Sequence, residues 1–222
     1  MAILAGGLAH EIRNPLSTLT LNLELLAEDA EEGETPRDRR MLQRISRLQD
    51  ECHHLEEILN AFLQFTRSTE PERVPLDLNQ LVHKFIDFYT PRAQENSVEI
   101  SLHLGSDLPM ILGDPLLLRQ VLTNLVANAE QAMPEGGTIE LQTAHQQEQV
   151  ILAVIDTGKG ISPQGQEKMF DPFFSTKSGG SGLGLPTVRK IVHAHNGEIR
   201  CESEQGKGTR FLLSFPISQN NG

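Results

Sequence analysis

Two stretches near the N-terminus repeat apolar residues at alternating steps of four and three, which leaves one apolar stripe along a helix. The stripes comprise Ile12, Leu16, Leu19, Leu23 and Leu26, and then Met41, Ile45, Leu48, Cys52, Leu55, Leu59 and Phe62. Between them, the acidic segment "EDAEEGETPRD" contains Gly and Pro and predicts the turn of a helical hairpin. Two helices alone cannot bury these stripes, so the pattern predicts a homodimer in which two hairpins form a four-helix bundle.

The helical period stops at "STEPERVPLDL", where prolines and charges predict a domain boundary. We expect a helical hairpin over residues 1–68, a linker over 69–76 and a second domain over 77–218. In the second domain, alternation and β-branched content predict strands at "VEISLHL", "TIELQTA", "VILAVID", "GEIRCES" and "TRFLLSF". Helices are predicted at "LDLNQLVHKFIDFYTPRA", "DPLLLRQVLTNLVANAEQAM" and "LPTVRKIVHAHN". The predicted fold is therefore multidomain, an all-α hairpin followed by an α/β (α+β) sandwich.

Charge and composition narrow the classes of partner. The 222 residues carry a formal net charge of -11, which argues against nucleic acid or an anionic membrane as partner. We find no apolar run of roughly 18 residues and no signal peptide, and Cys52 and Cys201 are too few and too far apart for a disulfide framework. We expect a cytoplasmic chain without membrane contact, whose parent protein could be anchored through a region absent here.

Two asparagines stand four residues apart in "LRQVLTNLVANAEQAM", so the side chains of Asn124 and Asn128 leave one face of a helix. A carboxamide oxygen is a hard ligand, and Mg²⁺ is usually held by few protein ligands together with phosphate and water. The pair therefore suggests a magnesium site to which one of the two amide oxygens contributes. The alternative is that both amides hydrogen-bond a loop.

Two glycine clusters follow in the second domain. "IDTGKGIS" places Asp156 at a strand end before Gly158 and Gly160, where a carboxylate could accept from the exocyclic amine of adenine and the glycines allow close approach of a flat base. "SGGSGLGLPTVRKIV" places Gly179, Gly180, Gly182 and Gly184 before a helix, an arrangement that cradles phosphate. Neither a P-loop nor a dinucleotide-binding fingerprint fits these spacings. A plain turn is the alternative reading of the first cluster.

Between the clusters, "PQGQEKMFDPFFSTKSGG" has the composition of a lid with an apolar anchor made by Phe170, Phe173 and Phe174. The alternative is that the three rings belong to the core. Lys177, at the glycine edge of the lid, could reach a terminal phosphate.

The last cluster lies in the first predicted helix, where "AHEIRNPLSTL" sets His10 beside Glu11, with Asn14 one turn later. "HEIRNPL", "NLVANA", "DTGKG", "FDPFF", "GSGLGL" and "GKGTRF" resemble, in order, the H, N, G1, F and G2 boxes and the later Gly-Thr motif of sensor histidine kinases of bacterial two-component signalling. The resemblance covers nearly the whole chain and is strongest to the nitrogen-regulation-type branch.

The resemblance implies a dimerisation and phosphoacceptor hairpin followed by a Bergerat-type ATP-binding domain. His10 matches the phosphorylated residue, Glu11 its acid/base partner, Asn128 the Mg²⁺ ligand and Asp156 the adenine contact, while Asn14 would serve dephosphorylation of the regulator. The ATP site implied by the motifs comprises Asn124, Asn128, Asp156, Gly158, Gly160, Lys177, Gly180, Gly182, Leu183, Gly184 and Thr209.

The implied activity is ATP-dependent autophosphorylation of His10 and transfer to an aspartate of a response regulator, with phosphatase activity toward it. Two other classes stay open, a Bergerat-fold ATPase that works as a conformational clamp and an ATP-binding dimeric scaffold without phosphotransfer. Only nine residues precede His10, so we expect an excised piece that lacks a sensor region. The signal, the cognate regulator and attack in cis or in trans are not predicted.

Overall fold

The computed structural model describes residues 2–31, 35–66, 70–177 and 180–218. Side chains are described from Ile12 onward in the first helix, except for residues 13 and 29–31, and from Arg37 onward in the second. The chain divides into two compact units, which we describe separately: residues 1–68 with 175–183, and residues 69–174 with 184–222. The predicted order of a helical region followed by an α/β domain is confirmed.

The first unit is built on two long helices, α1 (Ala2–Glu31) and α2 (Pro36–Thr66). The turn between them is shorter than the sequence suggests, because Thr35 and Asp38 cap α2. The Thr35 hydroxyl donates to Asp38 Oδ2 at 2.6 Å, and the Asp38 N–H donates to Thr35 Oγ1 at 3.3 Å. The Thr35 hydroxyl and the Thr35 N–H both donate to Asp38 Oδ2, and these two hydrogen bonds hold the pKa of the Asp38 carboxyl below its usual value. The second helix therefore begins within the predicted turn.

Only some of the predicted stripe residues are buried within this pair. Those buried among the described side chains are Leu16, Ile45, Cys52 and Leu59. Other stripe residues are exposed, namely Ile12, Leu19, Leu26, Met41, Leu48 and Leu55. The pair thus carries a large apolar surface that its own two helices do not cover.

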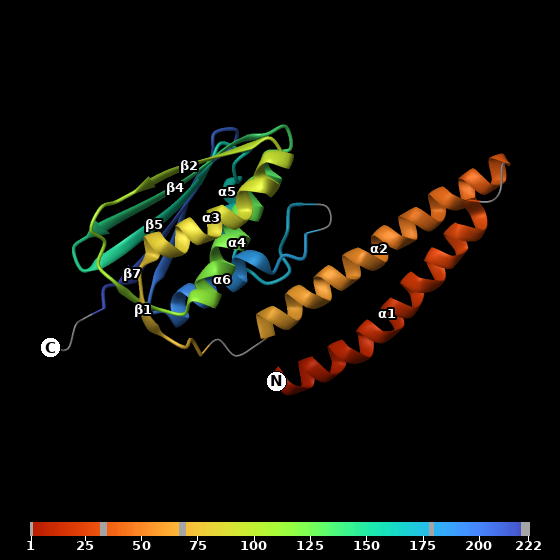
Figure 1. Cartoon of the computed structure of the whole chain (residues 1–222), viewed down its shortest axis with the longest axis horizontal. Helices are drawn as coiled ribbons and strands as arrows, with labels where there is room; N and C mark the ends of the chain where they lie inside the picture. Colours follow the sequence, from red (N-terminus) through yellow and green to blue (C-terminus); the bar gives the residue numbers. More distant parts are fainter. Residues whose placement is uncertain (1, 32–34, 67–69, 178–179, 219–222) are drawn as a thin grey trace. The chain divides into compact units, whose positions relative to one another are not determined.

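The second unit has two layers, with helices on one face of a mixed sheet (Figure 1). The sheet order is β2-β4-β5-β7-β6, with β2 parallel to β4 and the other pairs antiparallel. The strands are β2 (Val98–Leu104), β4 (Gly137–Gln146), β5 (Gln149–Asp156), β6 (Glu198–Glu204) and β7 (Gly208–Pro216). The helices are α3 (Leu78–Glu95), α4 (Pro115–Ala132), α5 (Pro163–Lys168) and α6 (Gly184–Ala194). Alternate residues of the strands and one face of each long helix form a single core, including Phe85, Leu122, Leu141, Ile191 and Phe215.

A short sheet forms where the chain enters this unit. β1 (Val74–Leu76), within the expected linker, pairs antiparallel with β3 (Ile111–Gly113). The residues before β1 bind both helix ends nearby: Glu72 N–H donates to Asp114 Oδ2 at 3.1 Å, and the Arg73 guanidinium donates to the Ala194 carbonyl. The Asp114 N–H donates to Nε2 of the buried His195 at 2.9 Å. The entry segment is therefore tied to the start of α4 and the end of α6.

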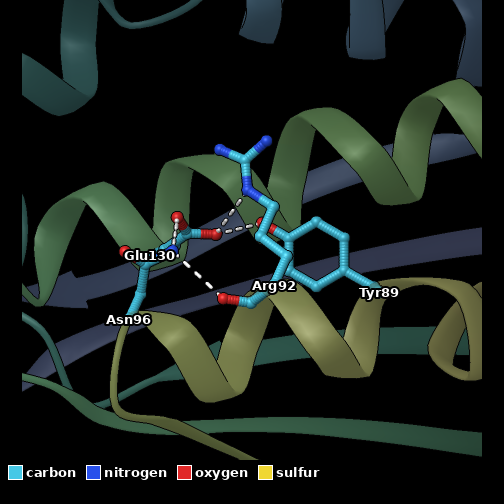
Figure 2. Close-up of polar contacts among 4 residues, drawn as sticks. All are labelled: Tyr89, Arg92, Asn96 and Glu130. Carbon is cyan, nitrogen blue, oxygen red and sulfur yellow. Dashed lines mark hydrogen bonds and ion pairs between the residues drawn. The ribbon is translucent and has the colours of Figure 1, made fainter.

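Figure 2 shows a polar cluster that joins the ends of α3 and α4. The Glu130 carboxylate of α4 accepts from the Tyr89 hydroxyl, from Arg92 Nε at 3.4 Å and from Asn96 Nδ2 at 2.9 Å. Asn96 also donates to the Arg92 carbonyl at 3.1 Å and so caps α3. Burial and the Glu130 hydrogen bond raise the pKa of Tyr89. The cluster fixes the last turns of the two helices against each other.

Candidate functional site

The two asparagines of α4 lie beside the first residue of α6. Asn124 and Asn128 are half-buried, and a Cβ added to Gly184 would lie 3.8 Å from Asn124 Oδ1 and 4.0 Å from Asn128 Nδ2. The N–H groups in the first turn of an α-helix have no partner within the helix and carry a partial positive charge, and α6 has no acidic side chain in its first turn. Donors for an anion and a carboxamide oxygen for a cation therefore meet at one place.

The opposite end of the predicted site is the end of β5. Asp156 is only 6% exposed, and its Oδ1 accepts from the Gly158 N–H at 2.9 Å. Thr209, 5% exposed, is the direct partner of Asp156 on β7. A buried carboxylate and a buried hydroxyl thus lie on directly paired residues at the ends of β5 and β7.

The two glycines after Asp156 are required by close packing. A Cβ on Gly158 would lie 2.7 Å from the Cβ of Ala132 at the end of α4, and the Lys159 N–H donates to the Ala132 carbonyl at 3.2 Å. Gly160 has φ +67°, and a Cβ there would overlap the carbonyl oxygen of Glu204. The turn therefore packs between the end of α4 and the hairpin of β6 and β7. A side chain at either glycine would disturb this packing.

The three predicted lid phenylalanines differ from one another. Phe170 packs on the core, and its ring lies under the Arg189 guanidinium at 5.1 Å from the ring centroid. Phe174 is half-buried, whereas Phe173 is 62% exposed with φ +66°, an unusual backbone conformation for an aromatic residue. The predicted lid segment also contains α5, whose N-cap is Ser162.

The glycine-rich segment belongs to the first unit and is described by itself. Ser175 Oγ accepts from the Lys177 N–H at 3.1 Å, and the Gly180 N–H donates to the Lys177 carbonyl at 3.4 Å. Gly182 has φ +66°, and Leu183 is buried. Gly179 lies outside the described residues. The roles of Lys177, Gly180, Gly182 and Leu183 in nucleotide binding remain predictions.

The phosphoacceptor motif lies on α1. The backbones of His10 and Glu11 are helical, and their side chains lie outside the described residues. Asn14 is exposed, and its carbonyl accepts from the Thr18 hydroxyl at 3.0 Å. The motif is thus on a separate unit from Asn128 and Asp156.

Metal binding rests on Asn128 alone among the residues predicted from the sequence. In the described part of the chain, no three His, Cys, Asp or Glu side chains are grouped so that they could hold a metal ion. An amide oxygen next to the N-terminus of α6 nevertheless fits Mg²⁺, which takes most of its ligands from phosphate and water. Asn128 therefore fits the cation that the motif implies.

Sequence reasoning missed Ser203 and Gln166, which hold the turn after Asp156. Ser203 Oγ accepts from the Ile161 N–H at 2.8 Å, and Gln166 Nε2 donates to the Ile161 carbonyl at 2.8 Å. Ser203 is distant in sequence from Asp156, and the register of β6 and β7 brings it there, so no local pattern could have found it. Gln166 instead reaches the Ile161 carbonyl from the short helix α5, which the sequence did not predict.

Two family models match the chain. Residues 1–71 match the His Kinase A (phospho-acceptor) domain, and residues 113–219 match the histidine kinase-, DNA gyrase B-, and HSP90-like ATPase family. They match residues of both units, in the order that the sequence motifs predict. Across the described residues, no helix is long and apolar enough to cross a membrane.

Known proteins give the same result. The chain is 34% identical to the sensor histidine kinase ZraS of Escherichia coli over 97% of its own length, but spans only 45% of that relative. It is 30% identical to the catalytic domain of histidine kinase ThkA, covering 66% of this chain and 96% of that one, with a TM-score of 0.61. Full-length ShkA in complex with AMPPNP aligns over 100% of this chain and 47% of its own, with 29% identity and a TM-score of 0.76. ThkA in complex with the response regulator protein TrrA aligns over 99% and 62%, with 25% identity and a TM-score of 0.70.

Proposed function

Because this chain belongs to the histidine kinase family, we propose that it is an ATP-dependent protein-histidine kinase that phosphorylates its own His10. We propose further that the phosphoryl group passes to an aspartate of a response regulator. The observation that carries the proposal is a set of two neighbouring residue pairs in the α/β unit. Asn128 lies beside Gly184 at one end of the predicted site, and Asp156 lies beside Thr209 at the other. Residues 1–68 would supply the phosphoacceptor, residues 77–218 the nucleotide site, and residues 69–76 the link.

In this proposal the nucleotide binds along the α/β unit. Asp156 accepts from the adenine amine, and the N–H groups at the start of α6 bind phosphate oxygens. The Asn128 oxygen would hold Mg²⁺, which when bound neutralises phosphate charge. Lys177 and the glycines of the lid would add donors at the terminal phosphate, and the lid phenylalanines would anchor the lid. AMPPNP bound to ShkA, a protein of similar fold, supports this assignment.

The chemical step depends mainly on alignment. A neutral ring nitrogen of His10 attacks the γ-phosphorus, the bond to the β,γ-bridging oxygen breaks, and ADP leaves. Glu11 would accept a hydrogen bond from the other ring nitrogen, which fixes the tautomer and stabilises the positive charge that develops on the imidazole.

We propose that two copies of the hairpin pair to form a four-helix bundle. The exposed apolar residues of α1 and α2 favour this arrangement, since Leu19, Leu48 and Leu55 are left uncovered within one copy. The bundle would present His10 to the nucleotide and then to the receiver domain of a regulator. The ThkA complex with TrrA supports a response regulator as the partner.

Asn14 serves the reverse reaction in this proposal. It lies one helical turn after His10 and is exposed, so its carboxamide could orient a water molecule for hydrolysis of a phosphoaspartate on the docked regulator. Attack of His10 on ATP needs no such water. Asn14→Ala should therefore keep labelling of His10 and lose phosphatase activity. A parallel loss of both activities would mean that Asn14 only supports the helix next to Pro15.

The test of the kinase proposal is the chemistry of the label. Protein incubated with [γ-³²P]ATP and Mg²⁺ should carry label that is stable in base and labile in acid, and peptide mapping should place it on His10. His10→Gln should abolish the label, whereas His53→Gln, at an exposed histidine of α2, should retain it. ATP hydrolysis without any protein-bound label would support a clamp-type ATPase, and ATP binding without turnover would support a scaffold.

A further inference from the structure

Three polar side chains lie in one row across neighbouring strands at the end of the sheet. Asp156 on β5 is the direct partner of Thr209 on β7, and Thr209 is the direct partner of Ser203 on β6. Residues directly opposite in antiparallel strands point to the same face of a sheet. Ser203 therefore stands behind Thr209 as seen from Asp156, although no sequence motif singles it out.

The contacts of Ser203 fix where the hydroxyl protons lie. Its Oγ is 2.8 Å from the Ile161 nitrogen, 2.8 Å from the Gly208 oxygen and 3.0 Å from Thr209 Oγ1. A backbone N–H can only donate and a backbone carbonyl can only accept. The single proton of Ser203 must therefore go to Gly208, because two oxygens at 2.8 Å need a proton between them.

This assignment determines the orientation of Thr209. Since the proton of Ser203 is used for Gly208, the contact between the two hydroxyls must use the proton of Thr209. Thr209 then presents only lone pairs to any further group. Asp156, as a carboxylate, also has no proton to donate. At the ends of β5 and β7, Thr209 and Asp156 therefore both present hydrogen-bond acceptors to a bound ligand.

Ser203 is also held firmly in this position. Gln166 Nε2 donates to the carbonyl of Ser203 at 2.9 Å and to the carbonyl of Ile161 at 2.8 Å. It thereby ties the end of β6 to the residues that follow the Asp156 turn. Thr209 is 5% exposed, so water has little access to compete for its hydroxyl. The surrounding structure therefore holds the Thr209 hydroxyl in the orientation in which its oxygen acts as a hydrogen-bond acceptor.

We propose that Ser203 is a positioning residue that sets nucleobase specificity by holding the Thr209 hydroxyl as an acceptor. These two acceptors favour adenine, because its exocyclic amine is a hydrogen-bond donor. They disfavour hypoxanthine, which carries a carbonyl oxygen, an acceptor, at the same position. Without Ser203, the Thr209 proton could rotate toward such a carbonyl and stabilise it. The inference rests on the proposed function, since it assumes that these two acceptors bind the base of ATP.

The experiment compares ATP with inosine triphosphate (ITP) by titration calorimetry on the whole chain. For Ser203→Ala we expect the ratio Kd(ITP)/Kd(ATP) to fall about tenfold, since one hydrogen-bond preference is removed. Ser203→Thr keeps the hydroxyl and should keep the wild-type ratio. Ser214→Ala is the matched control, because Ser214 is five residues beyond Thr209 on β7 and so points to the opposite face.

The outcomes separate a specificity role from a structural one. Equal weakening of both nucleotides by Ser203→Ala would overturn the inference, because it would mean that Ser203 only shapes the turn. Thr209→Val removes the hydroxyl while keeping the side-chain volume, and it should also lower the ratio Kd(ITP)/Kd(ATP). An unchanged ratio in this variant would contradict the inference. If the wild-type chain bound neither nucleotide, the proposed function would fail together with the inference. A wild-type preference for ATP that Ser203→Ala leaves intact would overturn the inference alone.

Discussion

The two units of this chain use apolar residues in opposite ways. In the α/β unit, helices and sheet enclose a continuous core, with side chains such as Val82, Leu122 and Ile139 fully buried. In the helical pair, Leu16, Ile45 and Leu59 are buried, while Leu19 and Leu48 remain more than half exposed. The difference indicates that the α/β unit is stabilised from within, whereas the helical pair needs a further surface to cover it.

The largest expected effect comes from breaking the core of the α/β unit. Leu122 on α4 is 0% exposed, so Leu122→Ala should lower the free energy of unfolding of this unit by about 3 kcal/mol through lost burial and a residual cavity. Urea unfolding followed by circular dichroism would measure the change. Leu116→Ala, at an exposed leucine of the same helix, is the matched control and should change little.

In the helical pair, by contrast, substitution of an exposed apolar residue should weaken self-association. Leu48 is 54% exposed, and Leu48→Asp should weaken self-association at least about tenfold, because a charge would enter the proposed dimer contact. Sedimentation equilibrium gives the dissociation constant, and ATP binding measures the α/β unit in the same sample. An unchanged dimer would place the contact elsewhere on the hairpin.

A smaller effect is expected at the Tyr89–Glu130 contact between α3 and α4. Tyr89→Phe should lower the free energy of unfolding by about 1–2 kcal/mol, since it removes a donor from a largely buried carboxylate. The pKa of Tyr89 is raised on folding, so its contribution is present below the ordinary pKa of 10 and is lost as the pH rises through the folded-state value. The stability difference between wild type and variant should therefore shrink in strong base. A difference that stays constant with pH would contradict this assignment.

The smallest expected effect is a pH dependence that comes from His195. Burial lowers the pKa of His195, and the nearby positive charge of Arg73 lowers it further, while the hydrogen bond from Nδ1 to the Ile191 carbonyl and the Asp114 carboxylate oppose the shift. Nε2 accepts from the Asp114 N–H. A lowered pKa means that the stability of the α/β unit is full above pH 6.5, the ordinary value, and falls as the pH drops toward the folded-state pKa.

His195→Gln should remove this acid-sensitive part, which is at most about 1.4 kcal/mol per pH unit. Thermal unfolding between neutral and mildly acidic pH would show it as a flatter profile. His193→Gln, at an exposed histidine in the last turn of α6, should keep the wild-type profile. Identical profiles for wild type and His195→Gln would mean that His195 is not the group responsible.

The sequence predicted the two units better than it predicted the contacts within them. Alternation located all five strands of the large sheet within one or two residues, since side-chain period is a local property. It missed β1, β3 and α5, which are short, and it did not predict that β2 pairs in parallel with β4. The turn after α1 was predicted too long because the Thr35–Asp38 cap was overlooked.

The candidate site shows the same difference between local motifs and contacts that are distant along the chain. Asp156, Asn128 and the glycines stand in recognisable local motifs, so the sequence alone suggests them as candidates. Ser203 and Glu130 matter through partners that are distant along the chain, and strand register or helix packing alone brings those partners together. Such residues carry no local signal and need the structure to be found.

The central claim is that nucleotide binding and phosphoryl acceptance are on separate units, and the ATP affinity of His10→Gln tests it most directly. Titration calorimetry should give this variant the wild-type dissociation constant for ATP, while the same preparation takes up no acid-labile label. Asp156→Asn should show the converse defect in binding, since an amide replaces an acceptor for the adenine amine. A loss of ATP affinity in His10→Gln as large as that in Asp156→Asn would contradict the claim.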